Sequence, residues 1–360
     1  MSQIRSANIK EDWRGYLEKD GVVVLKGVLA QEEVGQAKSL FWQWLADLGT
    51  GIRPNDPTTW ADENWPGVTS LGFLPTHGGG HSAAAWYLRT RPAIQEAFAR
   101  VWEVKQEELL SSFDTFIVWR PWWDDGNGTY QTSWTPCVEN LHVDQNPHYK
   151  KGLQCVQGMV PLLPVRKEIG GLQVVPNTNT AEQQAEFVKR YPMTKLDRDD
   201  WLELNNNDPI IGTGQFIEAD PGDLILWDSR TVHGGFVGPG PVSNSPAMAE
   251  STASESKQAN TELARMSFTV CMTPASKASQ QVIQQRCEAF QKGRCLTHWP
   301  HEFHPHYMND TFGSRIQPQS FTHKFPITDT IKRLVRGPAK PSVSAAEQLF
   351  FNRLMSAGAE

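Results

Sequence analysis

The sequence offers no paired cysteines. Its cysteines are five in number, an odd count, and none stands in a C-x-x-C pair: Cys137, Cys155, Cys271, Cys287 and Cys295. Such a set argues against a disulfide framework and favours a reducing compartment, so we expect a cytoplasmic protein. Cys155 and Cys271 occur in apolar runs, where buried thiols are expected.

Long apolar runs are also missing. No stretch approaches the roughly 20 apolar residues that a membrane helix needs. The polar segment from Met1 to Trp13 lacks the apolar region of a secretory signal, and residues 357–360 match no peroxisomal or endoplasmic-reticulum retention signal. These absences predict that no membrane is a partner of the protein.

Basic residues are not in excess. The 34 Lys and Arg residues against 40 Asp and Glu give a net charge of −6, which argues against a nucleic-acid partner. With 39% hydrophobic residues, the 360 residues suffice for one large domain or two small ones. The 14 tryptophans exceed the six tyrosines, and packing explains most of them, although a few could line a pocket.

The expected secondary structure changes character near residue 105. Before it, periodicity and turn residues predict helices at 11–19, 30–48 and 92–103, a strand at 22–25 and a long loop at 49–80. After it, short β-type runs dominate, at residues 113–119, 141–143, 153–161, 172–175, 214–219, 224–227 and 266–272. Helical patterns recur at 180–191, 196–204, 276–293 and 343–356. Regularly spaced short strands favour a β-barrel or a two-sheet jelly roll.

The chain shows no internal repeat and no clean linker. We therefore expect a single domain over residues 1–360, mainly β, with its core at about 105–275. Helical decoration is expected at 11–104 and 276–360. A stretch rich in Ser, Ala and Pro, about 238–260, predicts an insertion loop outside the core.

The segment from Asn140 to Gln145 contains His142 and Asp144, two residues apart. On an extended strand, residues i and i+2 point to the same face. With ten histidines and 40 acidic residues, about one such H-x-[DE] match is expected by chance, so the pair alone has little specificity. A structural histidine is the simplest interpretation of His142 taken by itself.

His233 follows a predicted strand and is a candidate third ligand. Strands distant in sequence lie side by side in a jelly roll, so His233 can meet His142 and Asp144. Two imidazoles and one carboxylate on one face of a ferrous ion leave positions open for a cosubstrate and dioxygen. The three residues therefore suggest a mononuclear Fe(II) site.

Arg265 and Ser267 lie two residues apart on a later predicted strand. An arginine offers a two-pronged donor to a carboxylate, and a serine on the same face adds another donor. This pair fits the distal carboxylate of 2-oxoglutarate. A surface salt bridge is the alternative interpretation of Arg265.

These motifs, in this order, resemble the phytanoyl-CoA dioxygenase family of Fe(II)- and 2-oxoglutarate-dependent oxygenases. The similar segments are Asp20 to Val24, His142 to Asp144, Gly170 to Thr178, Pro221 to Leu224, and His233 to Gly234. Each motif is modest, and their order along about residues 15–275 is what makes the resemblance specific.

The resemblance implies a double-stranded β-helix core (a cupin-like jelly roll) with flanking N- and C-terminal helices. It also implies Fe(II) held by His142, Asp144 and His233, with 2-oxoglutarate bound by Arg265 and O2 as oxidant. Gln157 stands where the family often has tryptophan, and its amide could bond the cosubstrate. Members of the wider superfamily that halogenate lack the carboxylate, so Asp144 favours hydroxylation or a related oxidation of a small molecule.

The sequence departs from the family pattern in two further places. Residues 177–179 read Asn-Thr-Asn where Gly-Ser-His is usual, and the gap from His233 to Arg265 is longer than usual. The insertion at 238–260 accounts for that extra length.

Substrate-binding candidates come from neighbouring segments, although a structural role is the simpler interpretation of each. They are Asp114, Trp119, Arg120, Gln145, His81 and Arg89, with His148 and Trp86 nearby. Arg89 and Arg120 would suit an anionic substrate if their side chains point at the iron cavity.

Four histidines cluster at His298, His301, His304 and His306. They suggest either a second metal site, with zinc as the metal that such ligands favour, or a Pro-interrupted surface segment. The prolines break any regular spacing and no cysteine joins the cluster, which favours the surface segment.

Two rival functions remain open. One is a cupin-like metalloenzyme that does not use 2-oxoglutarate, against which Arg265 and Ser267 argue. The other is a non-catalytic jelly-roll binding protein, against which the complete set of three candidate ligands argues.

Overall fold

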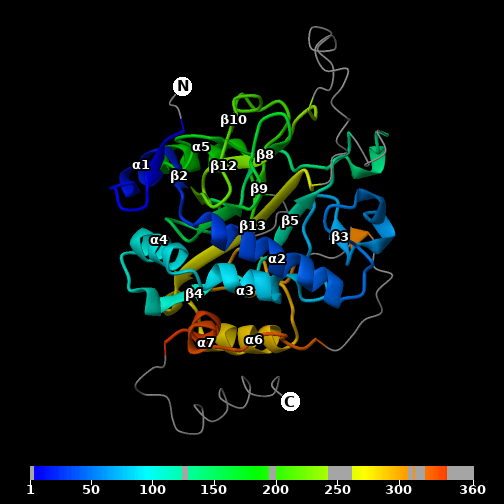
Figure 1. Cartoon of the computed structure of the whole chain (residues 1–360). Coiled ribbons are helices and arrows are strands. Elements are labelled where there is room, and N and C mark those ends of the chain that lie inside the picture. The colour runs from blue at the N-terminus through cyan, green and yellow to red at the C-terminus, as the bar shows by residue number, and fades with distance from the viewer. Residues whose placement is uncertain are drawn as a thin grey trace.

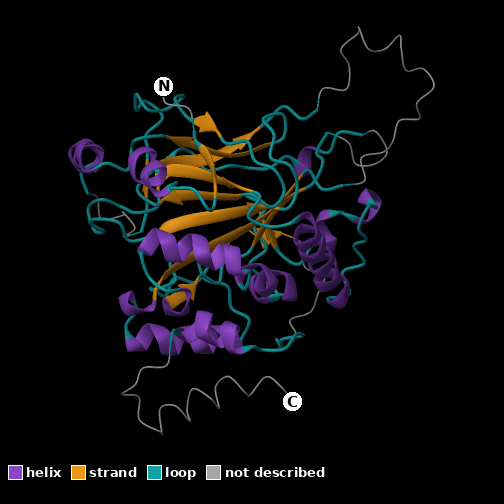
Figure 2. Ribbon diagram, turned by 60° about the vertical axis from the view of Figure 1, so that its left-hand side comes forward, coloured by secondary structure: helices purple, strands orange, loops and turns teal. Residues whose placement is uncertain are grey.

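Two β-sheets form the centre of the computed structural model, and helices cover one side of the larger sheet (Figures 1 and 2). The structure describes residues 4–123, 129–193, 200–241, 262–306, 311–312 and 321–338. The expected insertion loop at 238–260 and the expected helix at 343–356 fall largely or wholly outside these residues.

The larger sheet has seven strands. Its order is β1 (Ser6–Asn8), β2 (Val22–Lys26), β11 (Leu224–Asp228), β7 (Val156–Pro161), β13 (Arg265–Pro274) and β4 (Leu109–Ser111), with β5 (Phe116–Trp119) also paired to β13. Neighbours run antiparallel except β1 and β2, which are parallel. The strands at its centre, β11, β7 and β13, are buried along their whole length.

The smaller sheet has five antiparallel strands. Its order is β10 (Gln215–Phe216), β8 (Gly170–Val175), β12 (Val232–Val237), β6 (His142–Val143) and β9 (Leu202–Glu203). A separate pair joins β3 (Val68–Thr69) to β14 (Thr311–Phe312).

Helices α2, α3 and α4 lie across the outer face of the larger sheet, and α6 and α7 lie beyond them near β4 (Figure 1). The helices are α1 (Arg14–Asp20), α2 (Gln31–Asp47), α3 (Ala83–Arg89), α4 (Pro92–Trp102), α5 (Ala181–Arg190), α6 (Gln280–Gln291) and α7 (Asp329–Arg336). Short 3-10 turns occur at residues 57–59, 62–64, 79–81, 106–108, 132–134 and 275–277. None of the described helices is long and apolar enough to cross a membrane.

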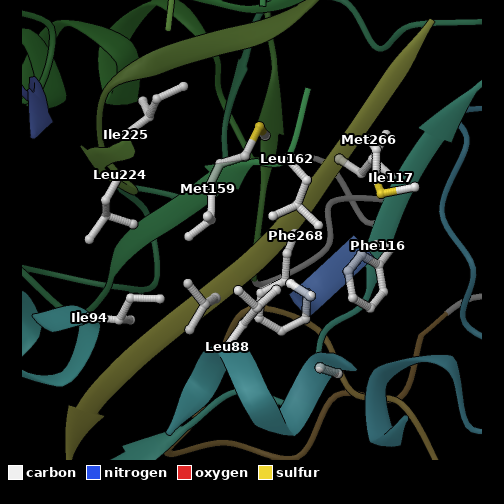
Figure 3. Packing of buried hydrophobic residues seen from close by; sticks show 14 of the residues in the cluster. Leu88, Ile94, Phe116, Ile117, Met159, Leu162, Leu224, Ile225, Met266 and Phe268 are labelled. Carbon is white, nitrogen blue, oxygen red and sulfur yellow. The ribbon is translucent and has the colours of Figure 1, made fainter. Parts of the chain in front are cut away.

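The two faces of β13 serve different purposes. Phe268 packs toward the helices, with its ring 4.9 Å from that of Phe116 and with Leu88 of α3 nearby (Figure 3). Arg265 and Thr269, displaced from Phe268 by an odd number of residues, line a cavity on the other face. The period of two in a strand thus separates the hydrophobic core from a polar interior.

Most of the expected elements are present, but the architecture is mixed rather than mainly β. Helices α3 and α7 and strand β12 are present although no element was predicted there, and residues 202–203 form a strand inside the expected helix 196–204. Strand β2 joins the seven-stranded sheet beside β11, so the sheet reaches into the region expected to be helical decoration. Periodicity identifies local elements, whereas such long-range pairing depends on tertiary contacts.

The cysteines agree with the expectation from their spacing. All five are free thiols, and Cys155 and Cys271 are fully buried side by side with Trp299.

The Asp223 side chain connects the end of β2 to the turn before β11 through hydrogen bonds. Its Oδ1 accepts a hydrogen bond from the Gly27 amide at 2.8 Å, and its Oδ2 accepts from the Asp220 amide and from Lys26 Nζ. The residue is 2% exposed. Asp223→Ala removes all three hydrogen bonds to this buried carboxylate, so we expect a loss of about 2–3 kcal/mol in the free energy of unfolding, measured by urea denaturation.

Asp220→Ala is the matched control, because the Asp220 side chain is 53% exposed and its ion pairs with Lys26 and Arg166 lie at the surface. We expect it to cost less than about 1 kcal/mol. Equal losses for the two variants would show that Asp223 has no special structural role.

Candidate metal centre

His142, Asp144 and His233 meet where β6 pairs with β12. His142 and His233 are direct cross-strand partners, and their ring centroids are 4.5 Å apart. Asp144 follows β6 by one residue. The potential ligand atoms of the three residues all lie within 4.8 Å of one another, and no other such group of three occurs in the described part of the chain. A single ion can therefore contact all three.

The imidazoles are oriented with Nε2 toward the centre of this group. Nδ1 of His142 lies 2.7 Å from the Asn140 carbonyl, and Nδ1 of His233 lies 2.9 Å from the Thr231 carbonyl. A carbonyl only accepts hydrogen bonds, so each Nδ1 carries a proton, and Nε2 is the nitrogen that a metal would bind in place of a proton. Backbone carbonyls that orient ligand imidazoles in this way are usual at metal sites.

Asp144 supplies the charge of the group. Its Oδ2 lies 3.1 Å from His233 Nε2 and accepts a hydrogen bond from Gln157 Nε2 at 2.6 Å. Burial raises the pKa of the Asp144 carboxyl, but the imidazoles of His298, His233 and His142 outweigh burial and hold the pKa well below its ordinary value. The carboxylate is thus ionised at neutral pH, as a metal ligand must be. Donor set, orientation and charge all fit a divalent cation.

A cavity of about 540 Å³ opens beside this group, between the two sheets. From the smaller sheet and its loops it is lined by His142, Asp144, Leu172, Asp200, Trp201 and His233; from the larger sheet and its loops by Asp114, Ile117, Trp119, Gln157, Met159, Trp227, Arg265 and Thr269. The lining thus combines aromatic and apolar surface with a few polar groups, as is typical of small-molecule sites.

Arg265 lines the same cavity and has no carboxylate partner among the described residues. Its guanidinium lies 4.5 Å from the Trp119 ring and donates to Met159 Sδ at 3.2 Å. Nε of Arg265 and the hydroxyl of Ser267 are both buried without hydrogen-bond partners. Ser267 is fully buried and is not among the residues that line the cavity, whereas the Arg265 guanidinium lines it and is suited to an anionic ligand.

Gln157 lies in the cavity as expected, but its amide donates to Asp144. The sequence pattern predicted a contact with a cosubstrate. In the structure the amide orients a candidate metal ligand, and its contact with a cosubstrate stays a prediction.

Four of the proposed substrate residues do not reach the cavity. His81 bonds the Arg294 carbonyl, and Arg89 donates to the carbonyls of Gly80 and Asp114. Arg120 donates to the Trp60 carbonyl and pairs with Asp62 at 2.6 Å. The Gln145 amide donates to the carbonyls of Lys150 and Gly152.

Each of these side chains forms hydrogen bonds with nearby backbone carbonyls that would otherwise be unsatisfied. Because neither Arg89 nor Arg120 points at the cavity, the idea that they bind an anionic substrate is wrong. Trp119 and Asp114 do line the cavity.

The histidine cluster of the C-terminal segment contributes two cavity residues. His298 Nε2 lies 3.9 Å from Asp144 Oδ2, and His306 Nε2 lies 2.9 Å from Asp114 Oδ1. His301 and His304 bond elsewhere, to Thr273 and Glu302. The interpretation as a surface segment is therefore wrong for His298 and His306, which line the cavity, and the four histidines form no second metal group among the residues that the structure describes. The density of histidines in the segment was the available clue to this role.

Comparison with known proteins decides the family. The sequence profile of the phytanoyl-CoA dioxygenase family (PhyH) matches residues 17–237, more than half of the chain. The chain belongs to the phytanoyl-CoA dioxygenase family. The match includes His142, Asp144 and His233 of the candidate metal centre and ends before Arg265, so the resemblance of motifs is confirmed at the level of the family.

The individual proteins that are similar to this chain share only a minority of its residues. Ava biosynthesis cluster protein O of Aspergillus versicolor is 28% identical over 303 residues, which cover 81% of this chain and 87% of that protein. Among solved structures, the apo form of the non-heme monooxygenase ThoJ matches with a TM-score of 0.42 at 14% identity, covering 74% of this chain and 78% of that chain.

The epimerase SnoN, solved in complex with Fe3+, alpha ketoglutarate and nogalamycin RO, gives a TM-score of 0.43 at 15% identity, covering 73% and 82% of the two chains. The carbocyclase SnoK gives 0.44 at 14%, covering 75% and 87%. The family assignment rests on the sequence profile and not on these structures.

Proposed function

We propose that this protein is an Fe(II)- and 2-oxoglutarate-dependent dioxygenase that oxidises a C–H bond of a small molecule. For hydroxylation, one 2-oxoglutarate and one O2 are consumed with the substrate, and succinate, CO2 and the alcohol are formed. The observation that supports this proposal most is the placement of Arg265, a buried cation without an anionic partner, in the same cavity as His142, Asp144 and His233.

The donor set favours iron over the alternatives. Two imidazoles and one carboxylate leave open positions on an octahedral ion, and they suit ferrous iron better than the all-oxygen shells of magnesium or calcium. Bound iron would supply the activation of dioxygen. Since Asp144 occupies the carboxylate position, hydroxylation or a related oxidation is favoured over halogenation.

The chain's own residues provide binding and orientation. His142 and His233 present Nε2, Asp144 presents an ionised carboxylate, and Gln157 holds that carboxylate in place. Arg265 would bind the distal carboxylate of 2-oxoglutarate, with the Ser267 hydroxyl as an additional donor. The proposal includes the architecture: the two sheets form a jelly roll within one oxygenase domain.

Two alternatives make different demands on Arg265. A cupin-like metalloenzyme that does not use 2-oxoglutarate would need no carboxylate anchor, and a non-catalytic binding protein would need no oriented metal ligands. Both leave the unpaired buried guanidinium unexplained, because burying a charge without a partner is costly.

The proposal is tested without knowledge of the substrate. Under anaerobic conditions, we expect calorimetry to show that 2-oxoglutarate binds tightly only when Fe(II) is present. In air, the same mixture should release succinate slowly even without substrate. Binding of 2-oxoglutarate that ignores Fe(II), or no succinate at all, would contradict the proposal.

Gln157→Leu is expected to weaken Fe(II) affinity by about 10–100-fold, because groups that orient metal ligands contribute about that much. The reason is the loss of the 2.6 Å hydrogen bond to Asp144 Oδ2. Affinity is measured by competition with a chromophoric chelator. Gln154→Leu is the control, since its amide bonds the Lys151 carbonyl away from the cavity. If both variants keep wild-type affinity, Gln157 does not position Asp144.

A further inference from the structure

One end of the cavity holds a second polar group that the proposed cofactors leave unused. Asp114 Oδ1 accepts hydrogen bonds from the Thr115 amide at 2.8 Å and from His306 Nε2 at 2.9 Å. No hydrogen bond from the described residues reaches Asp114 Oδ2. The side chain is only 8% exposed, and what remains accessible lies along the cavity. A carboxylate oxygen is thus available to a ligand inside the protein.

His298 lies between this group and the metal centre. Its Nε2 is 3.9 Å from Asp144 Oδ2 and is buried without a hydrogen-bond partner. The ring is held by Trp299, with centroids 5.0 Å apart, and its backbone carbonyl accepts from Cys155 Sγ. A buried polar atom without a partner requires an explanation, and a ligand in the cavity supplies one.

The charge of the cavity limits what that ligand can be. Among the described residues, four acidic side chains line it, Asp114, Glu139, Asp144 and Asp200, against one cationic side chain, Arg265, and no lysine. The charges of Fe(II) and doubly ionised 2-oxoglutarate cancel. Arg265 offsets only one of the carboxylates, so the cavity stays negative and repels an anionic group.

We propose that Asp114, His306 and His298 form a substrate subsite that binds an amine or hydroxyl group of a neutral or cationic substrate. This inference rests on the proposed function and adds the substrate class. Asp114 Oδ2 accepts from the amine or hydroxyl, and His298 Nε2 faces the same space. The apolar side chains of Leu71, Phe73 and Ile117 contact the body of the substrate. Within this cavity the same charges would repel the polyanionic carrier of an acyl-CoA thioester.

Three small aromatic probes that differ in one group test the subsite: 2-phenylethylamine, 2-phenylethanol and 3-phenylpropionate. Their dissociation constants are measured by calorimetry at pH 7, anaerobically, with Fe(II) and 2-oxoglutarate and also with neither. With Fe(II) and 2-oxoglutarate present, the amine should bind at least about tenfold more tightly than the carboxylate, with the alcohol between them. With neither, Arg265 is free to bind the carboxylate probe, so in that state the amine is compared with the alcohol and should bind more tightly.

Asp114→Asn keeps the shape and the acceptor for Thr115 but removes the charge. It should weaken binding of the amine about tenfold, and His298→Gln provides a second variant should the first fail to fold. Asp200→Asn is the matched control: it also removes one charge from the cavity lining but lies outside the subsite, and we expect less than about a threefold change.

The subsite is overturned if the carboxylate binds as tightly as the amine when Fe(II) and 2-oxoglutarate are present, or if the alcohol binds as tightly as the amine when they are absent. It is also overturned if Asp114→Asn and Asp200→Asn have equal effects, or if no probe binds at millimolar concentration. Because the measurement without Fe(II) and 2-oxoglutarate needs no catalysis, the two proposals fail separately. The expected probe preference without succinate release would reject the oxygenase and keep the subsite. Succinate release without the preference would do the opposite.

Discussion

Replacing His142 or Asp144 with alanine is expected to abolish Fe(II)-dependent 2-oxoglutarate turnover. Each residue presents one of three ligand atoms that lie within 4.8 Å of one another. Groups that only orient a metal ligand contribute about 10–100-fold to metal affinity, so loss of a ligand should exceed about 100-fold. Succinate release from 2-oxoglutarate, followed in air with saturating Fe(II), is the measurement.

The two variants should differ in how they fail. His142→Ala removes a neutral donor, whereas Asp144→Ala also removes the only carboxylate of the group and leaves the Gln157 amide without its acceptor. We therefore expect the larger loss of Fe(II) affinity for Asp144→Ala. Partial recovery with added imidazole should be confined to His142→Ala, because imidazole replaces the missing ring and not the missing charge.

His148→Ala is the matched control for folding. His148 stands close to the metal motif in sequence, but its Nε2 contacts the Tyr191 carbonyl at 2.6 Å and it does not line the cavity. Its variant should keep succinate release within a few-fold of wild type. Undiminished turnover in His142→Ala or Asp144→Ala would contradict the assignment of the metal centre.

The sequence could predict the metal group because two of its three candidate ligands are close together in the sequence. His142 and Asp144 are brought to one face by the strand period alone. His233 required one further assumption, that two distant strands pair, and the register of β6 against β12 meets it by placing the two histidines opposite each other. Arg265 and Ser267 were found by the same period on β13.

The rest of the cavity depends on the path of the chain in three dimensions. His298 and His306 were interpreted as part of a surface segment because prolines interrupt their spacing, yet that segment folds back to the sheet opening. From the sequence alone, Arg89 and Arg120 are as suitable for binding an anion as Arg265 is. In the structure, backbone carbonyls of neighbouring loops take their donors, a demand that no sequence pattern reveals.

The name of the family suggests an anionic CoA substrate, whereas the charge of the cavity disfavours an anionic substrate. A phytanoyl-CoA substrate would bring several negative charges, whereas Arg265 is the only cationic side chain among the residues that line this cavity. Membership of a family establishes common ancestry and fold, while the substrate is decided by the side chains of the site.

Arg265→Met is expected to raise the KM for 2-oxoglutarate at least about 30-fold, because a buried charge-assisted pair is worth roughly 2–5 kcal/mol. Burial lowers the pKa of the Arg265 guanidinium to about 10, which leaves it cationic at pH 7. Methionine keeps an unbranched side chain of similar reach against Trp119 and Met159 but provides no donor. The turnover number with saturating 2-oxoglutarate should fall much less, since in the proposed site Arg265 would bind the distal carboxylate and would not touch the reacting carbons.

Stability measurements separate this role from a structural one. Without 2-oxoglutarate, Arg265 is a buried cation with no carboxylate partner in the described part of the chain, so replacing it by methionine should leave the Tm unchanged or raise it. In wild type, 2-oxoglutarate with Fe(II) should raise the Tm through binding to the native state, and Arg265→Met should lose that rise. Arg120→Met is the control: it breaks the pair with Asp62 and should lower the Tm while the response to 2-oxoglutarate is kept. If Arg265→Met instead lowers the Tm and retains wild-type affinity for 2-oxoglutarate, Arg265 supports the fold, and the cosubstrate must bind elsewhere.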